Sequence, residues 1–186
     1  MSYVNVYLGG DFISVVSDTQ ITRPDGTILQ EEMKKFLVTD QKVLIATAGN
    51  ADVAKIMFDF FKKNQGLQFH DVVAEVDRFL GEIPVFKDFT ISQRVIVAGF
   101  EKGIVKATSL GMKINQKSEK VNYESGSIID LIPEDYNFNI GDYSKRLKTF
   151  TPKGIVDLQK KALLKVSRHS KQVNDTICEE VITDGN

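Results

Sequence analysis

The sequence is poor in the residues that build disulfides, zinc sites and membrane spans. Its 186 residues include one cysteine, two histidines, four prolines and no tryptophan. The single cysteine, Cys178, allows no internal disulfide, and so few cysteines and histidines argue against a structural zinc site. No apolar run approaches the roughly 20 residues of a membrane helix, and residues 1–10 lack the basic and apolar blocks of a signal peptide. We therefore expect a cytoplasmic protein with no membrane partner.

Neither sign of charge is in excess. Lysine and arginine total 24, aspartate and glutamate total 25, and the formal net charge is −1. Dedicated nucleic-acid binders normally carry a basic surplus, which this chain lacks. Hydrophobic residues make up 42% of the chain, which is enough for a substantial core. No repeat or linker composition divides the sequence, so we expect a single domain over residues 1–186.

The first 50 residues have the pattern of paired strands. Four strands in two hairpins are expected over residues 4–8, 12–17, 35–39 and 42–47. Gly9-Gly10-Asp11 is a typical hairpin turn between the first two. The run 43–48 is almost entirely apolar or small, which predicts a strand covered on both faces. Residues 22–33, between the two hairpins, predict a turn and a polar loop.

Helical periodicity follows, and then further strands. Helices are expected over residues 51–63, 70–80 and 152–171, and strands near residues 94–100, 104–107, 126–131 and 176–183. Asn50 is a suitable N-cap for the first helix. Thr151 and Pro152 supply an N-cap and a first-turn proline for the last one. Helices that arrive in blocks between hairpins indicate an α+β fold, with helices packed outside antiparallel sheets.

Three short segments carry a resemblance to a known family. They are residues 13–20 (ISVVSDTQ), the pair Lys34-Lys35 before Phe36, and residues 46–52 (ATAGNAD). Together they resemble the proteasome β-subunit family, and most closely the peptidase subunits of bacterial two-component ATP-dependent proteases. The resemblance covers residues 2–64, and extends loosely to residues 95–107 and to Asn174–Ile177. It implies a four-layer αββα sandwich, in which two antiparallel sheets lie between helix layers.

The resemblance also implies a catalytic site. In that family the first residue of the mature chain attacks a peptide carbonyl, and its own α-amine takes the proton. On the family's pattern Ser2 matches the nucleophile after removal of Met1, Asp18 the acidic residue and Lys35 the lysine, with Lys34 as an alternative. The implied activity is that of an N-terminal-nucleophile hydrolase, a threonine-protease-like peptidase or amidohydrolase.

The chemistry of this set can also be argued from the residues. A free α-amine has a pKa of about 7.7–8, and a neighbouring cation such as Lys35 lowers it because like charge disfavours the protonated amine. A modest decrease makes the amine a competent general base at neutral pH. Each residue also has an ordinary interpretation: Ser2 as a common residue after methionine, Asp18 as a turn residue and Lys35 as a solvated strand residue.

Other positions depart from the family's pattern. The glycine whose backbone N–H lines the oxyanion hole falls at Ala46, which keeps the N–H. Residues 130–135 stand where the family has a glycine–serine turn, and Lys171 and Val173 stand for a late aspartate and serine. These departures support an alternative hypothesis, a catalytically inactive subunit of the same fold with a structural or partner-binding role. Retention of Met1 would favour that alternative, because it caps the amine.

Assembly and partners are likewise implied by the resemblance. The family forms rings that enclose its proteolytic sites, so a homo-oligomer is expected. Residues 130–150, where the family makes many subunit contacts, are altered here, and a dimer is therefore the alternative to a ring. The resemblance also implies a peptide substrate and an ATP-dependent unfoldase partner, with no cofactor and no metal, and the charge balance predicts no nucleic-acid partner.

Overall fold

The structure is a computed structural model, and it describes residues 2–23, 27–30, 32–82, 92–113, 116–133, 136 and 150–184. The strands are β1 Val4–Leu8, β2 Phe12–Ser17, β3 Ile21–Thr22, β4 Ile28–Gln30, β5 Phe36–Val38, β6 Leu44–Gly49, β7 Gln93–Glu101, β8 Ile104–Lys113, β9 Gln116–Glu124, β10 Ile128–Leu131 and β11 Cys178–Thr183. The helices in these ranges are α1 Ala51–Lys63, α2 Phe69–Glu82 and α4 Pro152–Ser167. None of them has the length and apolar character that a membrane crossing requires.

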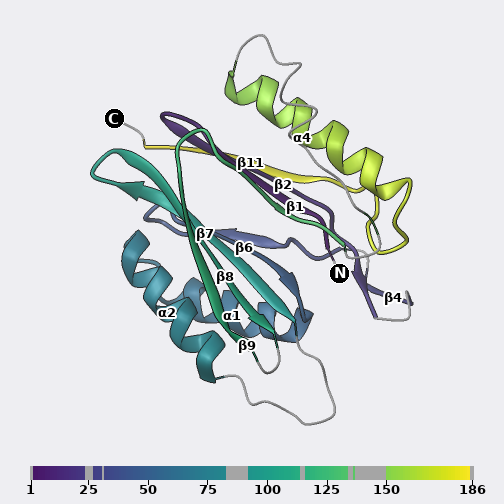
Figure 1. The fold of residues 1–186 in the computed structure, drawn as a ribbon, viewed down its shortest axis with the longest axis horizontal. Coiled ribbons are helices and arrows are strands. Elements are labelled where there is room, and N and C mark those ends of the chain that lie inside the picture. Colours follow the sequence, from purple (N-terminus) through teal and green to yellow (C-terminus); the bar gives the residue numbers. More distant parts are fainter. Residues whose placement is uncertain are drawn as a thin grey trace.

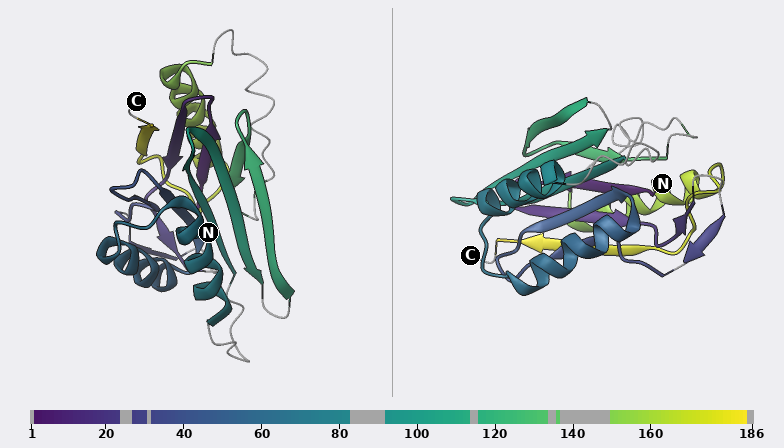
Figure 2. Two further views of the ribbon diagram at one scale, coloured as in Figure 1. Left: turned by 90° about the vertical axis from the view of Figure 1, so that its left-hand side faces the viewer. Right: turned by 90° about the horizontal axis from the view of Figure 1, so that it is seen from below.

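The strands form two main antiparallel sheets. One has the order β10-β1-β2-β11, the other has the order β5-β6-β7-β8-β9, and β3 and β4 form a separate hairpin. Helix α4 lies outside the four-stranded sheet, against β2, whereas α1 and α2 lie outside the five-stranded sheet (Figures 1 and 2). The mixed α+β class expected from the sequence is therefore confirmed.

Buried side chains fall into three main groups that match this arrangement. A central cluster takes residues from both sheets, among them Val4, Val6, Ile13, Val15, Leu44, Ala46, Ile96 and Ala98. A second joins the outer face of the five-stranded sheet to α1 and α2, through Ile45, Val97, Met57, Phe61, Val72 and Val76. A third joins the four-stranded sheet to α4, through Tyr3, Val16, Leu163 and Val166. Strands β1, β2 and most of β6 are therefore buried on both faces, and the almost entirely apolar or small sequence of β6 fits this burial.

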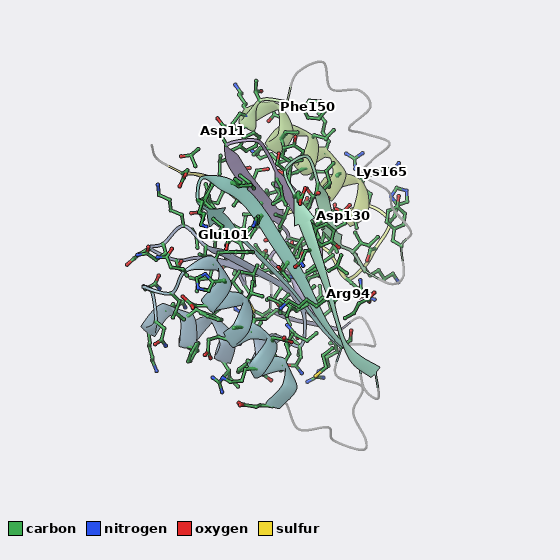
Figure 3. All side chains as sticks on the ribbon, turned by 60° about the vertical axis from the view of Figure 1, so that its left-hand side comes forward. Asp11, Arg94, Glu101, Asp130, Phe150 and Lys165 are labelled. Carbon is green, nitrogen blue, oxygen red and sulfur yellow. The ribbon has the colours of Figure 1, made fainter. Side chains whose placement is uncertain are left out.

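Several elements differ from the sequence-based expectation. The loop expected over residues 22–33 contains the β3–β4 hairpin, and β9 was not predicted because its sequence, QKSEKVNYE, is mostly polar. The last helix ends at Ser167 rather than near Lys171. The altered region over residues 130–150 lies largely outside the described residues. In Figure 3 the labelled Asp11, Phe150 and Lys165 lie at the periphery, whereas Asp130 on β10 lies further in.

Candidate functional site

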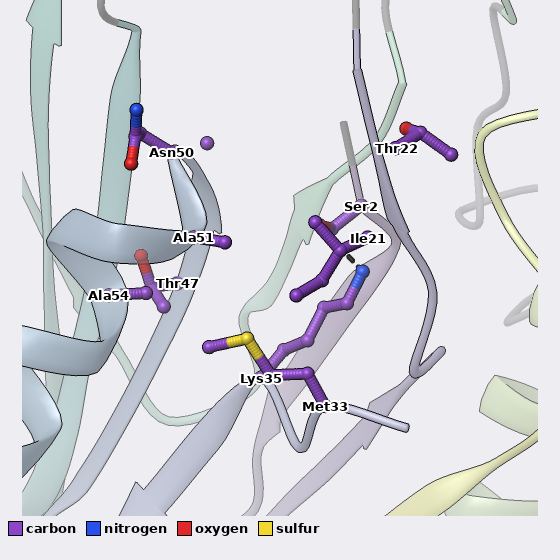
Figure 4. A pocket seen from close by; sticks show the side chains of 10 residues that line it. Ser2, Ile21, Thr22, Met33, Lys35, Thr47, Asn50, Ala51 and Ala54 are labelled. Carbon is purple, nitrogen blue, oxygen red and sulfur yellow. Dashed lines mark hydrogen bonds between the residues drawn. The ribbon is translucent and has the colours of Figure 1, made fainter. Parts of the chain in front are cut away.

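Three chain segments bring Ser2, Asp18 and Lys35 together. Ser2 precedes β1 and Asp18 follows β2, and the antiparallel register that pairs Val4 with Ser17 places these two ends side by side. Lys35, just before β5, donates from Nζ to Ser2 Oγ at 2.7 Å and to Asp18 Oδ2 at 3.1 Å. Figure 4 shows the contact between Ser2 and Lys35. The three side chains named from the sequence therefore meet, and their catalytic role stays a prediction.

The Asp18 carboxylate and the Lys35 ammonium have hydrogen-bond partners on every side. Asp18 Oδ1 accepts from the Tyr3 N–H at 2.8 Å, and Oδ2 accepts from the Gln20 N–H at 3.0 Å. Lys35 Nζ also donates to the Gln20 carbonyl, so its three protons have three acceptors. The exposed fractions are 0% for Asp18, 3% for Lys35 and 9% for Ser2. Charges this deeply buried are tolerated only when paired and bonded in this way.

Burial shifts the proton affinity of both charged groups. It lowers the pKa of Lys35, and the neighbouring Asp18 carboxylate opposes the decrease. It raises the pKa of Asp18, and Lys35 together with the Tyr3 and Gln20 N–H groups opposes the increase. The mutual attraction thus favours the ion-paired state, in which a cation faces the Ser2 hydroxyl.

The structure distinguishes between the two adjacent lysines. Lys34 points the other way, with 49% of its side chain exposed, and pairs with Glu180 at 2.8 Å. Its Nζ lies 4.2 Å from the centre of the Phe36 ring. Only Lys35 reaches Ser2 and Asp18. The sequence left Lys34 open because the register of the strand that follows decides which of two neighbours faces inward.

A cleft opens beside Ser2. The volume of this cleft, including the solvent-filled space at its entrance, is about 340 Å³. Its lining residues are Ser2, Ile21, Thr22, Met33, Lys35, Thr47, Gly49, Asn50, Ala51 and Ala54. In Figure 4 Ser2 and Lys35 face the end of β6 and the start of α1 across this space. The cleft therefore offers a hydroxyl and a cation on one side and a strand-to-helix corner with small side chains on the other.

The structure corrects the position that the sequence aligned with the family's oxyanion-hole glycine. Ala46 lies in the middle of β6, fully buried, with Phe36 and Ile96 as its strand partners, and it does not line the cleft. Gly49, at the end of the same strand, does line it. The Thr47 N–H donates to the Lys35 carbonyl, on the β5 side. Because strand N–H groups alternate, the Gly49 N–H is directed to that same side, beyond the start of β5.

Further polar residues that support the site were not predicted. Asn174 accepts from the Thr19 N–H at 3.1 Å, and its Nδ2 donates to Thr19 Oγ1 at 3.0 Å. Gln20 Nε2 donates to the Lys171 carbonyl at 2.9 Å. These bonds tie the segment after β2 to the segment before β11. No sequence signal indicated them, because their partners are more than 150 residues apart.

The two late positions that depart from the family's pattern take no part with their side chains. Lys171 contributes only its backbone carbonyl, and Val173 is buried in the cluster beneath α4. Within the described ranges, no group of three or more histidine, cysteine, aspartate or glutamate side chains is placed to hold a metal ion. The polar side chains that line the cleft carry hydroxyls, an ammonium and an amide.

Comparison with known proteins bears on the fold. No family model matches this chain, and no curated protein matches it in sequence. Among solved structures it is similar to Anbu (ancestral beta-subunit) from Yersinia bercovieri, with a TM-score of 0.73 and 12% identity, over 97% of this chain and 81% of that chain.

These findings correct the family assignment drawn from the sequence. The expected likeness to peptidase subunits of two-component ATP-dependent proteases has no support from a family model, and a solved structure that the chain does resemble is that of Anbu. At 12% identity the likeness concerns the fold. The chain has a mixed α+β, proteasome-like fold.

Proposed function

We propose that this protein is an N-terminal-nucleophile hydrolase that cleaves peptide or other amide bonds, with Ser2 as the nucleophile once Met1 is removed. The observation that carries the proposal is the buried contact of Lys35 Nζ with Ser2 Oγ at 2.7 Å, at the edge of a cleft. An ammonium held there by Asp18 lowers the pKa of a free Ser2 amine and stabilises negative charge on Oγ.

The reaction follows from this geometry. The Ser2 amine takes the hydroxyl proton as Oγ attacks the substrate carbonyl carbon. The carbonyl oxygen becomes an oxyanion, and we assign the Gly49 N–H as the donor that stabilises it, because Gly49 lines the cleft. The resulting ammonium then protonates the leaving amine, which departs and leaves an ester on Ser2. Water, deprotonated by the same amine, hydrolyses the ester and restores the hydroxyl.

We further propose that residues 1–186 form one domain with a four-layer αββα arrangement. The positions of α4 outside one sheet and of α1 and α2 outside the other support it. Assembly of several copies is part of the proposal, with support from the likeness to a protein named as a beta-subunit. A cytoplasmic location and an unfoldase that supplies extended substrate complete the proposal.

The test compares two forms of the chain. In one form, removal of a cleavable fusion leaves Ser2 as the first residue, and in the other Met1 is retained. Each is incubated with a panel of fluorogenic peptide amides and with a peptide β-lactone that acylates nucleophilic hydroxyls, and adducts are read by intact mass spectrometry. We expect hydrolysis and a Ser2 adduct only in the form that begins at Ser2.

Two substitutions sharpen the assignment. Ser2→Ala is expected to abolish hydrolysis, and Lys35→Ala to reduce it at least about 100-fold, because the cation beside the nucleophile is lost. Lys34→Ala is the matched control, since Lys34 faces solvent and Glu180, and it should retain the parent rate. If neither form hydrolyses an amide or takes the lactone, the alternative of a catalytically inactive subunit with a structural or partner-binding role replaces the proposal.

A further inference from the structure

Gln93 places a fully buried amide side chain next to the corner where β6 turns into α1. Its exposed fraction is 0%. Its Oε1 accepts from the Asn50 N–H at 2.8 Å, and its Nε2 donates to Thr47 Oγ1. Thr47 Oγ1 in turn donates to the Arg94 carbonyl at 3.1 Å. One side chain from β7 thus bonds the chain on both sides of Gly49.

Gly49 packs closely against the Gln93 side chain, and a larger residue would clash there. Its φ is +136°, a conformation that L side chains rarely adopt. A Cβ at this position would lie 2.2 Å from the Ser92 carbonyl oxygen and 2.6 Å from Gln93 Oε1. The corner therefore requires glycine, and glycine has the greatest backbone freedom when neighbouring bonds are released. Something other than Gly49 must fix the direction of its N–H.

We infer that Gln93 is the positioning residue for the oxyanion donor. By holding Thr47 and Asn50, its side chain fixes the peptide group that carries the Gly49 N–H, so that this N–H is aimed into the cleft before substrate arrives. The inference rests on the proposed function, because it assigns Gln93 a role in that reaction. The inference goes beyond the proposed function because it names a residue that neither contacts Ser2 nor lines the cleft.

The expected signature is a loss of rate rather than of substrate affinity. A hydrogen-bond donor accelerates the reaction only if it is already in place when charge develops on the carbonyl oxygen. Substrate in its ground state carries little charge there, so binding depends weakly on the same donor. Removal of one oxyanion donor lowers kcat by about 100- to 1,000-fold. Misdirecting it should lower kcat by about 10- to 100-fold.

Another buried glutamine provides a matched control. Gln159 on α4 has an exposed fraction of 1%, and its Oε1 accepts from Ser14 Oγ at 2.9 Å. Its Nε2 donates to the Asn5 carbonyl at 3.3 Å. It lies between the four-stranded sheet and α4 and contacts no cleft residue. Gln159→Met and Gln93→Met both remove a buried amide with similar bonding, so a loss of stability alone affects both.

The experiment uses the form of the chain that begins at Ser2. For the parent and both variants, kcat and KM are measured on an amide that the parent cleaves, together with the affinity of a peptide boronic acid that forms a tetrahedral anion on Ser2 Oγ. In Gln93→Met we expect kcat and boronate affinity to fall about 10- to 100-fold, with KM within about twofold. Gln159→Met should lower the melting temperature and leave kcat, KM and the boronate affinity unchanged. Equal kcat values in the two variants would overturn the inference.

A measurement that needs no activity separates the two proposals. Amide hydrogen exchange at Asn50, whose N–H donates to Gln93, should be at least about tenfold faster in Gln93→Met and unchanged in Gln159→Met. An unchanged Asn50 rate in a reactive protein would overturn the positioning role alone. A parent that forms no boronate adduct would overturn the proposed function and, with it, this role. Should Gln93→Met not fold, Gln93→Asn, one methylene shorter, should give the same loss of kcat.

Discussion

Asp130 offers a test of the electrostatics inside the four-stranded sheet. It lies on β10 opposite Asn5 of β1, and its carboxylate accepts from Asn5 Nδ2. Burial raises the pKa of Asp130 from 3.8 to about 6, and the bond from Asn5 opposes the increase. Asp130→Asn keeps an oxygen that can accept the same hydrogen bond and removes the group that ionises.

The sign of the pH effect follows from proton binding. Between pH 3.8 and about 6 the folded protein holds a proton on Asp130 that the unfolded chain has released. The free energy of unfolding therefore decreases as the pH rises through this window. Two pH units correspond to about 3 kcal/mol, and partial contact of Asp130 with solvent reduces this to about 1–3 kcal/mol. Asp130→Asn should be more stable than the parent by that amount at about pH 7.5, and the advantage should vanish by about pH 3.5.

Urea unfolding followed by far-ultraviolet circular dichroism, at several pH values across this range, measures the difference. Asp157→Asn on α4 is the control, because that carboxylate is exposed and its neutralisation should change stability by less than about 0.5 kcal/mol. A stability difference for Asp130→Asn that is the same at every pH would refute the reasoning. So would a loss of stability at about pH 7.5, which would mean that the folded protein needs the carboxylate ionised.

Further outcomes are expected at the site. Lys35→Met leaves Asp18 buried without its cation and should lower the free energy of unfolding by about 3–5 kcal/mol in urea titrations, whereas Lys34→Met should change it by less than about 1 kcal/mol. Gly49→Ala should lower the melting temperature and the rate of amide hydrolysis together, because its Cβ meets the Ser92 carbonyl; a variant with the parent's melting temperature would contradict the tight corner. Asn174→Ala should speed hydrogen exchange at the Thr19 N–H, and an unchanged rate would show that the two loops are held by other contacts.

Local rules explain the parts of the fold that the sequence predicted. Alternating apolar residues around Gly9-Gly10-Asp11 predicted the β1–β2 hairpin, because that turn fixes the register of the strands it joins. Asn50 predicted the start of α1, where its side chain accepts from the Asp52 and Val53 N–H groups. Strand β9 was missed because it lies at the edge of the described sheet beside β8 and its residues 119–124 are mostly exposed, so no apolar alternation was required of it.

By itself the sequence grouped Ser2, Asp18 and a lysine of the pair 34–35 into one site through a family resemblance, as a prediction. Only the tertiary structure decided the rest. It selected Lys35 over Lys34, because neighbouring residues on an extended chain face opposite sides and packing sets which side is inward. It placed Gly49 rather than Ala46 at the cleft, because Ala46 lies in the middle of β6 and Gly49 at its end. It also brought Gln93 to the corner from a strand that follows two helices, a contact that no local pattern encodes.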